Sequence, residues 1–213
     1  LKSRRGNFAE AEAIFAGLVT TCRDTGITDP SLLPTVLYRL ATTQLKQGRS
    51  RDALTPFAEA VELSTATSGA DHPNTLLFRN DYARALAGLG DDEAAVKQLR
   101  VVLATRERVL GAGHPETSIT RVDLGRSLRR LGQPEEAEPQ LRRGRDDYTA
   151  AKGIDHPGRW IGTVHLAGAL IDLKRYDEAE KELTGTEAFY LGQSGAGSAD
   201  TRWVRARLSS LHL

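Results

Sequence analysis

Five histidines and several paired carboxylates are the side chains of this sequence that could do chemistry. Three of the histidines, His72, His114 and His156, recur at intervals of 42 residues, and each is followed by proline. If the interval marks a structural repeat, equivalent histidines lie about one helix pair apart, roughly 20 Å when a helix is about 10 Å wide. Shared metal coordination requires ligands within about 2 Å of the ion. We therefore predict that these histidines begin helices and hold no metal.

The carboxylate pairs have an equally structural interpretation. Asp91-Asp92 and Glu135-Glu136 fall where helices are expected to begin, and acids there complement the helix dipole. The sequence contains no phosphate-binding glycine loop after a strand, no nucleophile elbow, no HExxH and no CxxC pattern. We expect no catalytic residue, no metal site and no cofactor, and hence no enzyme.

Composition sets further limits on function and location. The 29 Lys and Arg nearly balance the 28 Asp and Glu, so a net charge of +1 gives no general attraction to nucleic acid. The single cysteine, Cys22, cannot form an internal disulfide, which fits a reducing compartment. With no signal peptide and no apolar run near 20 residues, the chain is expected to be cytoplasmic. Because methionine is absent even at position 1, we expect it to be part of a longer product.

The elements that must position any site follow the same 42-residue interval. Glycines expected to end first helices recur as Gly6, Gly48, Gly90 and Gly132, with Lys174 at the next equivalent place. Small residues precede them by seven positions: Ala41, Ala83, Gly125 and Ala167. Alanines follow by five positions, and large apolar residues follow four later: Ala11, Ala53, Ala95, Ala137, Ala179, then Phe15, Phe57, Leu99, Leu141, Leu183. This spacing predicts repeated pairs of helices, A and B, which interlock small against large side chains.

These residues carry a resemblance to a known family. The small residue, the Leu-Gly turn, the alanine and the following large apolar residue resemble the tetratricopeptide repeat, and the 42-residue length with His-Pro resembles its kinesin-light-chain subtype. That subtype is also common in bacterial multidomain regulators. The resemblance implies an all-α fold, a right-handed superhelical α-solenoid of antiparallel helix pairs.

The repeat register divides the sequence as one solenoid over residues 1–213. Residues 1–30 are expected to be a partial repeat whose only complete helix is helix B. Residues 1–5, before that helix, align with the last turn of a helix A. Complete repeats are expected at 31–72, 73–114, 115–156 and 157–198, and residues 199–213 form a terminal or capping helix.

Helical geometry also predicts which residues of each helix A face away from the core. With 100° per residue and Tyr82 at the centre of the buried stripe, outward positions recur in every repeat. They define a candidate groove consisting of Tyr38, Lys46, Leu77, Asn80, Arg84, Ile119, Val122, Arg126, Arg129, Arg130, Ile161 and Val164. Four of its arginines, with Lys46, form a predicted basic cluster beside an apolar strip. The alternative is that these arginines are solvated and pair with Asp81 or Asp123.

The sequence is compatible with three functions. The first is a protein-interaction module whose groove binds a peptide, acidic or aromatic-acidic, from a partner or from another domain of the same polypeptide. The second is a sensor or autoinhibitory segment of a larger regulator such as a nucleotide-switch ATPase, a transcriptional activator or a protease. The third, nucleic-acid binding through the arginines, is disfavoured by the balanced charge. Oligomerisation through the terminal repeats is open, and no membrane partner is expected.

Overall fold

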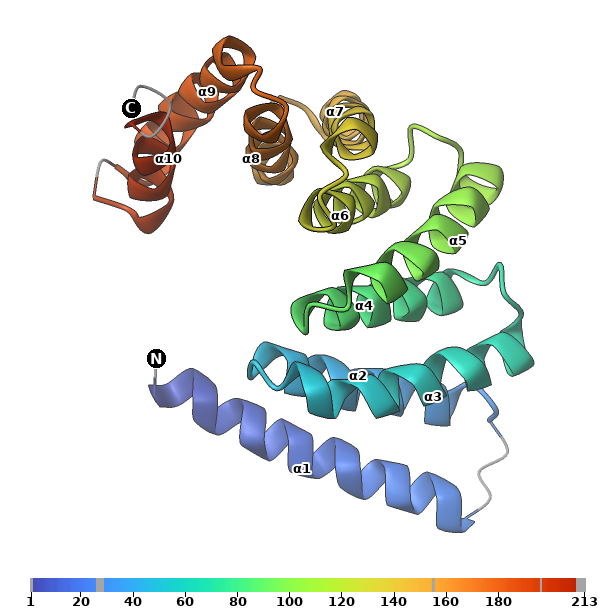
Figure 1. Cartoon of the computed structure of the whole chain (residues 1–213). Coiled ribbons are helices and arrows are strands. Elements are labelled where there is room, and N and C mark those ends of the chain that lie inside the picture. The colour runs from blue at the N-terminus through green and yellow to red at the C-terminus, as the bar shows by residue number, and fades with distance from the viewer. Residues whose placement is uncertain (1, 26–28, 155, 196, 210–213) are drawn as a thin grey trace. The chain divides into compact units, whose positions relative to one another are not determined.

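The computed structural model describes residues 2–25, 29–154, 156–195 and 197–209. Over these ranges the chain forms helices joined by short turns and contains no strand, which confirms the all-α class. The helices are α1 Lys2–Thr25, α2 Leu32–Lys46, α3 Ser50–Ser68, α4 Pro73–Gly88, α5 Asp92–Leu110, α6 Pro115–Arg130, α7 Pro134–Lys152, α8 Pro157–Asp172, α9 Tyr176–Ser194 and α10 Ala199–Ser209 (Figure 1).

The chain divides into two compact units, residues 1–105 and 106–213, with the boundary inside α5. In the first unit α1 packs on α2, α2 on α3 and α3 on α4, while α2 also contacts α4. In the second unit the helices from α6 to α10 pack in the same sequential way, and α6 contacts α8. Each unit is therefore a stack in which alternate helices, the A helices of the predicted pairs, lie next to one another.

The turn inside each helix pair depends on a residue with left-handed backbone. Gly48, Gly90 and Gly132 have φ values of 79°, 85° and 72°, and Lys174 has φ 59°. At Gly90 the following amide, that of Asp91, donates to the carbonyl of Leu86 at 3.1 Å and closes the helix end. Lys174 is the one non-glycine residue with positive φ in the described part of the chain.

The loop between pairs is organised by the recurring histidine. His114 has an extended backbone, its Nδ1 accepts a hydrogen bond from the Glu116 amide at 3.2 Å, and Pro115 is the first residue of α6. His72 and His156 cap α4 and α8 in the same way, at 3.2 and 3.0 Å. The prediction that these histidines begin helices is confirmed, because each satisfies an amide that the helix itself leaves unpaired.

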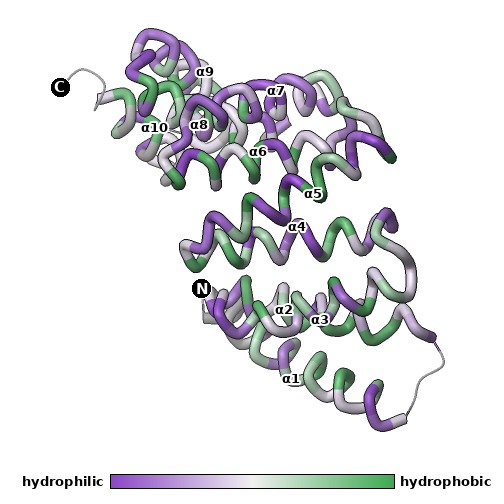
Figure 2. The backbone as a smooth tube through the Cα atoms, turned by 45° about the vertical axis from the view of Figure 1, so that its right-hand side comes forward, coloured by the Kyte–Doolittle hydropathy of each residue, from purple (hydrophilic) through white to green (hydrophobic). Residues whose placement is uncertain are grey.

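The core follows the predicted rows of small and large residues. Ala53, Ala95, Ala137 and Ala179 are 0% exposed, and the large residue one turn later in each helix is at most 1% exposed. The backbone as coloured in Figure 2 shows apolar positions recurring at intervals along the helices of both units. Burial of these repeated faces is what joins each helix to its neighbours.

The chain departs from the predicted register at its beginning. α1 is one continuous helix, Lys2–Thr25, so Gly6 does not end a helix A as the sequence predicted. Gly6 has no left-handed φ, unlike the three glycines that do form turns. At the other end α10 packs on α9 and buries Val204 completely, while residues 210–213 of the predicted terminal helix lie outside the described residues. The division into one solenoid with the stated repeat boundaries stays a prediction.

Candidate binding surface

The predicted groove residues come from α2 and α4 in the first unit and from α6 and α8 in the second. We call the solvent-facing sides of these helices the A-helix surface. In the first unit a polar chain links the two helices. The Tyr38 hydroxyl donates to Asp81 Oδ2 at 2.8 Å, and Arg84 Nη1 lies 3.3 Å from Asp81 Oδ1. Tyr38 also stacks on Phe78 at 4.4 Å between ring centres, and burial followed by Asp81 raises the pKa of its hydroxyl.

The other predicted residues of the first unit differ in accessibility. Lys46 is exposed in the last turn of α2, and Leu77 is half-buried against the core of that unit. Asn80 is only 3% exposed, so the prediction that it lines an open surface is wrong. Neighbouring A helices approach closely enough to enclose this short side chain, whereas the longer Arg84 reaches solvent.

The arginines of the second unit are accompanied by carboxylates. Arg126 Nη1 lies 3.7 Å from Asp123 Oδ1 within α6, and Arg129 Nε lies 2.5 Å from Asp172 Oδ2 of α8. Arg130 is exposed, and its Nη2 lies 3.4 Å from Ser127 Oγ. Arg126, Arg129 and Arg130 thus lie within the last five residues of α6. The pairing that the sequence left as an alternative is present for Arg84 and Arg126, and the structure adds the pairing of Arg129 with Asp172.

Arg84 belongs to the first unit and the other three arginines to the second. The structure therefore brings together Arg126, Arg129 and Arg130 on α6. A common cluster that includes Arg84 and Lys46 stays a prediction.

Apolar side chains accompany these arginines on the second unit. Ile161 near the start of α8 is 54% exposed, and Ile119, Val122 and Val164 are half-buried. An isoleucine with half of its surface in water gains from contact with an apolar partner. These four apolar side chains reach the surface of α6 and α8, and a continuous apolar strip there stays a prediction.

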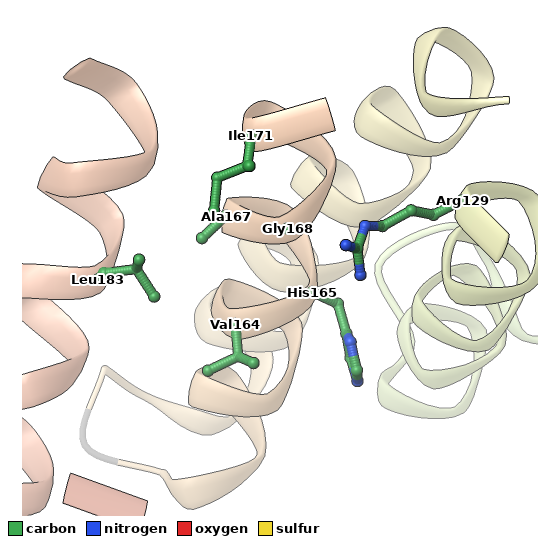
Figure 3. A pocket seen from close by; sticks show the side chains of 7 residues that line it. All are labelled: Arg129, Val164, His165, Ala167, Gly168, Ile171 and Leu183. Carbon is green, nitrogen blue, oxygen red and sulfur yellow. The ribbon is translucent and has the colours of Figure 1, made fainter. Parts of the chain in front are cut away.

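A small pocket of about 120 Å³ opens on the same helices. It is lined by Arg129, Val164, His165, Ala167, Gly168, Ile171 and Leu183 (Figure 3). Gly168 makes room for the arginine, because a Cβ at this position would lie 2.8 Å from Arg129 Cζ. The equivalent positions of the two preceding A helices hold Arg84 and Arg126. Helix α8 therefore has no side chain at the position where those two helices carry an arginine.

His165 also lines this pocket, and it lies outside the 42-residue series of His72, His114 and His156. Its burial, followed by the charges of Arg126, Arg129 and Arg130, lowers its pKa from 6.5 to about 3. The imidazole is therefore neutral at physiological pH and supplies a hydrogen-bonding group without charge. The signal that could have found it is its register, because His165 stands where earlier A helices carry Asp81 and Asp123.

The structure also bears on metal binding and on membrane insertion. The described residues include no group of three or more His, Cys, Asp or Glu side chains placed to hold a metal ion. None of the helices, as far as they are described, is long and apolar enough to cross a membrane.

Comparison with known proteins gives a family-model match and structural neighbours. The model described as tetratricopeptide repeat matches residues 32–108 and 102–150, which together exceed half of the chain. No curated protein sequence matches significantly.

Several solved structures share the fold. Kinesin-light-chain nearly identical TPR-like repeats from Podosopora anserina superpose with a TM-score of 0.75 at 23% identity, covering 87% of both chains. BtubC (BKLC) from P. vanneervenii has a TM-score of 0.79 at 17% identity, covering 91% of this chain and 77% of its own. A Rap protein complexed with competence and sporulation factor has a TM-score of 0.69 at 14% identity, covering 99% of this chain and 62% of its own.

The family match rests on the same features that the structure displays. Helix pairs with glycine turns, rows of buried alanines and a surface of adjacent A helices are what a stacked repeat of this class requires. Arrays of this kind are protein-interaction scaffolds that use the surfaces created by stacking. The chain belongs to the tetratricopeptide repeat family.

Proposed function

We propose that the A-helix surface binds an acidic peptide segment, containing an aromatic or other apolar residue, from a protein partner. The observation that carries this proposal is the combination on α6 and α8 of exposed apolar surface with three neighbouring arginines. Ile161 offers a contact for an apolar side chain, and the guanidinium groups of Arg126 and Arg130 offer forked donors for carboxylates. The segment comes from a separate protein or from another domain of the same polypeptide.

The existing ion pairs determine how such a segment would bind. Arg126 is 34% exposed beside Asp123 at 3.7 Å, a long contact for an ion pair. A partner carboxylate would compete with Asp123 for that guanidinium. Arg129, which is 2.5 Å from Asp172, instead holds α6 against α8. A Rap protein of this fold crystallised with competence and sporulation factor supports the idea that the fold accommodates a ligand.

The test is a fluorescence-anisotropy titration with labelled acidic and basic peptides of equal length, each with one tryptophan. We expect the acidic peptide to bind the wild type, and its affinity to fall at least about tenfold, or 1.4 kcal/mol, in Arg126→Glu with Arg130→Glu. A matched control reverses two exposed arginines on B helices, Arg51→Glu with Arg143→Glu, and should leave binding unchanged. Equal affinity in all three proteins, or equal binding of both peptides, would reject the proposal.

Self-association through the end of the first unit is a second proposal about partners. Leu18 of α1 is 42% exposed and Ile14 is 56% exposed, whereas Ala60 and Val102, at the equivalent register to Leu18, are 0% exposed. This apolar face of α1 fits a second copy of the chain. Sedimentation should show a concentration-dependent dimer that is weakened by Ile14→Glu with Leu18→Glu, and a monomer at all concentrations would exclude it.

A further inference from the structure

A second cavity, of about 330 Å³, lies where α7, the beginning of α8 and α9 meet. It shares no lining residue with the pocket on the A-helix surface. Its wall contains the indole of Trp160 and three cationic side chains, those of Arg145, Arg159 and Lys181. A cavity of this size suits one or two amino-acid side chains, because it is at the lower limit for small-molecule sites.

The carboxylates of this cavity are already used by one arginine. Arg145 Nε lies 2.7 Å from Asp146 Oδ1, and its Nη1 lies 2.5 Å from Glu182 Oε1. Arg145 is 11% exposed on its side chain, so this is a largely buried and satisfied group. Both acidic residues of the wall thus share one arginine, and these three side chains together carry one negative charge.

Arg159 and Lys181 have no such partner. The Arg159 guanidinium lies over the Trp160 ring at 4.1 Å from its centre, and it forms no ion pair with any carboxylate in the described ranges. The same holds for Lys181 on α9, which is exposed beside the cavity. With Arg145, these two cations give the wall three positive charges against the two negative charges of Asp146 and Glu182, and this excess of one favours an anion.

The cavity is open because α9 carries glycine at position 185. In the other B helices from α3 to α7 the equivalent residues are Glu59, Val101 and Arg143. A Cβ at Gly185 would meet only Trp160, at 4.0 Å, so a larger side chain there would extend over the indole. Glycine inside a helix lowers stability by about 0.5–1 kcal/mol relative to alanine. The sequence thus keeps a hollow where a side chain would both fit and stabilise.

The Trp160 indole is fixed as the floor of this hollow. It is 7% exposed and stacks on Phe189 at 4.7 Å between ring centres. Its Nε1 is buried and has no hydrogen-bond acceptor. A rigid aromatic floor with cations at its edge is suited to a planar carboxylate, which the Arg159 fork can bind with two hydrogen bonds.

We propose that this cavity is a second peptide-docking site, which binds a carboxylate side chain of an acidic segment through Arg159 and Lys181 above Trp160. It shares helix α8 with the A-helix surface but none of the residues named there, so each site can be tested by itself. A partner could engage the two sites with two segments, which would raise its affinity through effective concentration.

The experiment monitors tryptophan emission in a Trp203→Phe background, where Trp160 is the sole tryptophan of the two in the sequence. An acetylated octapeptide of alternating Glu and Ser is titrated against it, with a Lys-Ser octapeptide and inorganic phosphate in parallel. We expect a saturable emission change with the Glu peptide alone. Arg159→Gln with Lys181→Gln should raise the Kd at least tenfold.

Variants that fill the cavity distinguish binding inside it from non-specific electrostatic attraction. Gly185→Gln fills the hollow without changing charge and should abolish the response, whereas Gly17→Gln, whose Cβ would meet nothing within 4 Å, should preserve it. Thermal melts establish that both variants fold. Undiminished binding in Gly185→Gln, absence of a saturable change, or a response to phosphate in place of the peptide would overturn the proposal. Loss of the response in Arg126→Glu with Arg130→Glu would also overturn it, since it would place the peptide on the A-helix surface.

Discussion

The same substitution, glycine to alanine, should have opposite effects at two helical positions of the second unit. At Gly125 in α6 a Cβ would lie 2.5 Å from Leu141 Cγ and 3.1 Å from the carbonyl oxygen of Ala137. At Gly185 in α9 the nearest atom would be 4.0 Å away. Comfortable carbon contacts are about 3.5–4.0 Å, so only the first substitution creates a clash.

The magnitudes follow from two opposing contributions. Alanine in a helix interior is favoured over glycine by about 0.8–1.0 kcal/mol, which is the whole effect expected for Gly185→Ala. At Gly125 the added methyl must displace Leu141, which is 0% exposed and lies in the packed core. Overpacking of this kind costs about 1–3 kcal/mol, so Gly125→Ala should lose about 1 kcal/mol net. For a chain of this size, 1 kcal/mol corresponds to about 2–4 °C in Tm.

Thermal and denaturant unfolding of both variants measures the difference directly. Gly185→Ala should raise Tm by about 2–4 °C, and Gly125→Ala should lower it by a similar amount. In a double-mutant cycle, adding Leu141→Ala to Gly125→Ala should cost less than the sum of the single changes, because the smaller partner removes the clash. If Gly125→Ala stabilises the chain as much as Gly185→Ala does, the steric reasoning is refuted.

Three further predictions concern helix ends and pH. Lys174→Gly should stabilise the chain by about 1 kcal/mol in denaturant titrations, because φ 59° strains any residue with a Cβ; an unchanged or lower stability would contradict this. His114→Ala should destabilise by about 1 kcal/mol through loss of its bond to the Glu116 amide, and His114→Asn should retain most of that stability. His165 has a folded-state pKa of about 3, so below its ordinary 6.5 only the unfolded chain takes up the proton. The free energy of unfolding should therefore fall by about 1.4 kcal/mol from pH 7.5 to 5.5 through this residue. In His165→Gln the fall over the same pH interval should be smaller by that amount, as denaturant titrations at both pH values would show.

The turns and helix starts were predictable because their causes are local. Gly48, Gly90 and Gly132 adopt the left-handed backbone that ends a helix, and His-Pro satisfies the first amides of the next. Such chemistry depends on neighbours within a few residues and repeats with the sequence. The exception, Gly6, shows that a glycine marks a turn only when the residues around it also form one.

The candidate sites were less predictable because they depend on contacts between helices. Arg129 pairs with Asp172, 43 positions later, and nothing in either residue's immediate sequence indicates this. Asn80 faces outward by helical angle but is buried by its neighbours. The cavity above Trp160 exists because Gly185 leaves a space there, and an empty volume has no residue pattern of its own.

The loops between helix pairs have a consequence for how such a chain can grow. In the three loops that contain His-Pro, the histidine amide donates to the carbonyl of a glycine three residues earlier, at 3.3 Å for both His114 and His156, and the histidine side chain then caps the next helix. The geometry of the joint is thus contained in five consecutive residues. Units cut and rejoined at Gly-x-x-His-Pro should exchange places without redesign of the joint, which makes these loops natural points for duplication and for building chimaeric arrays.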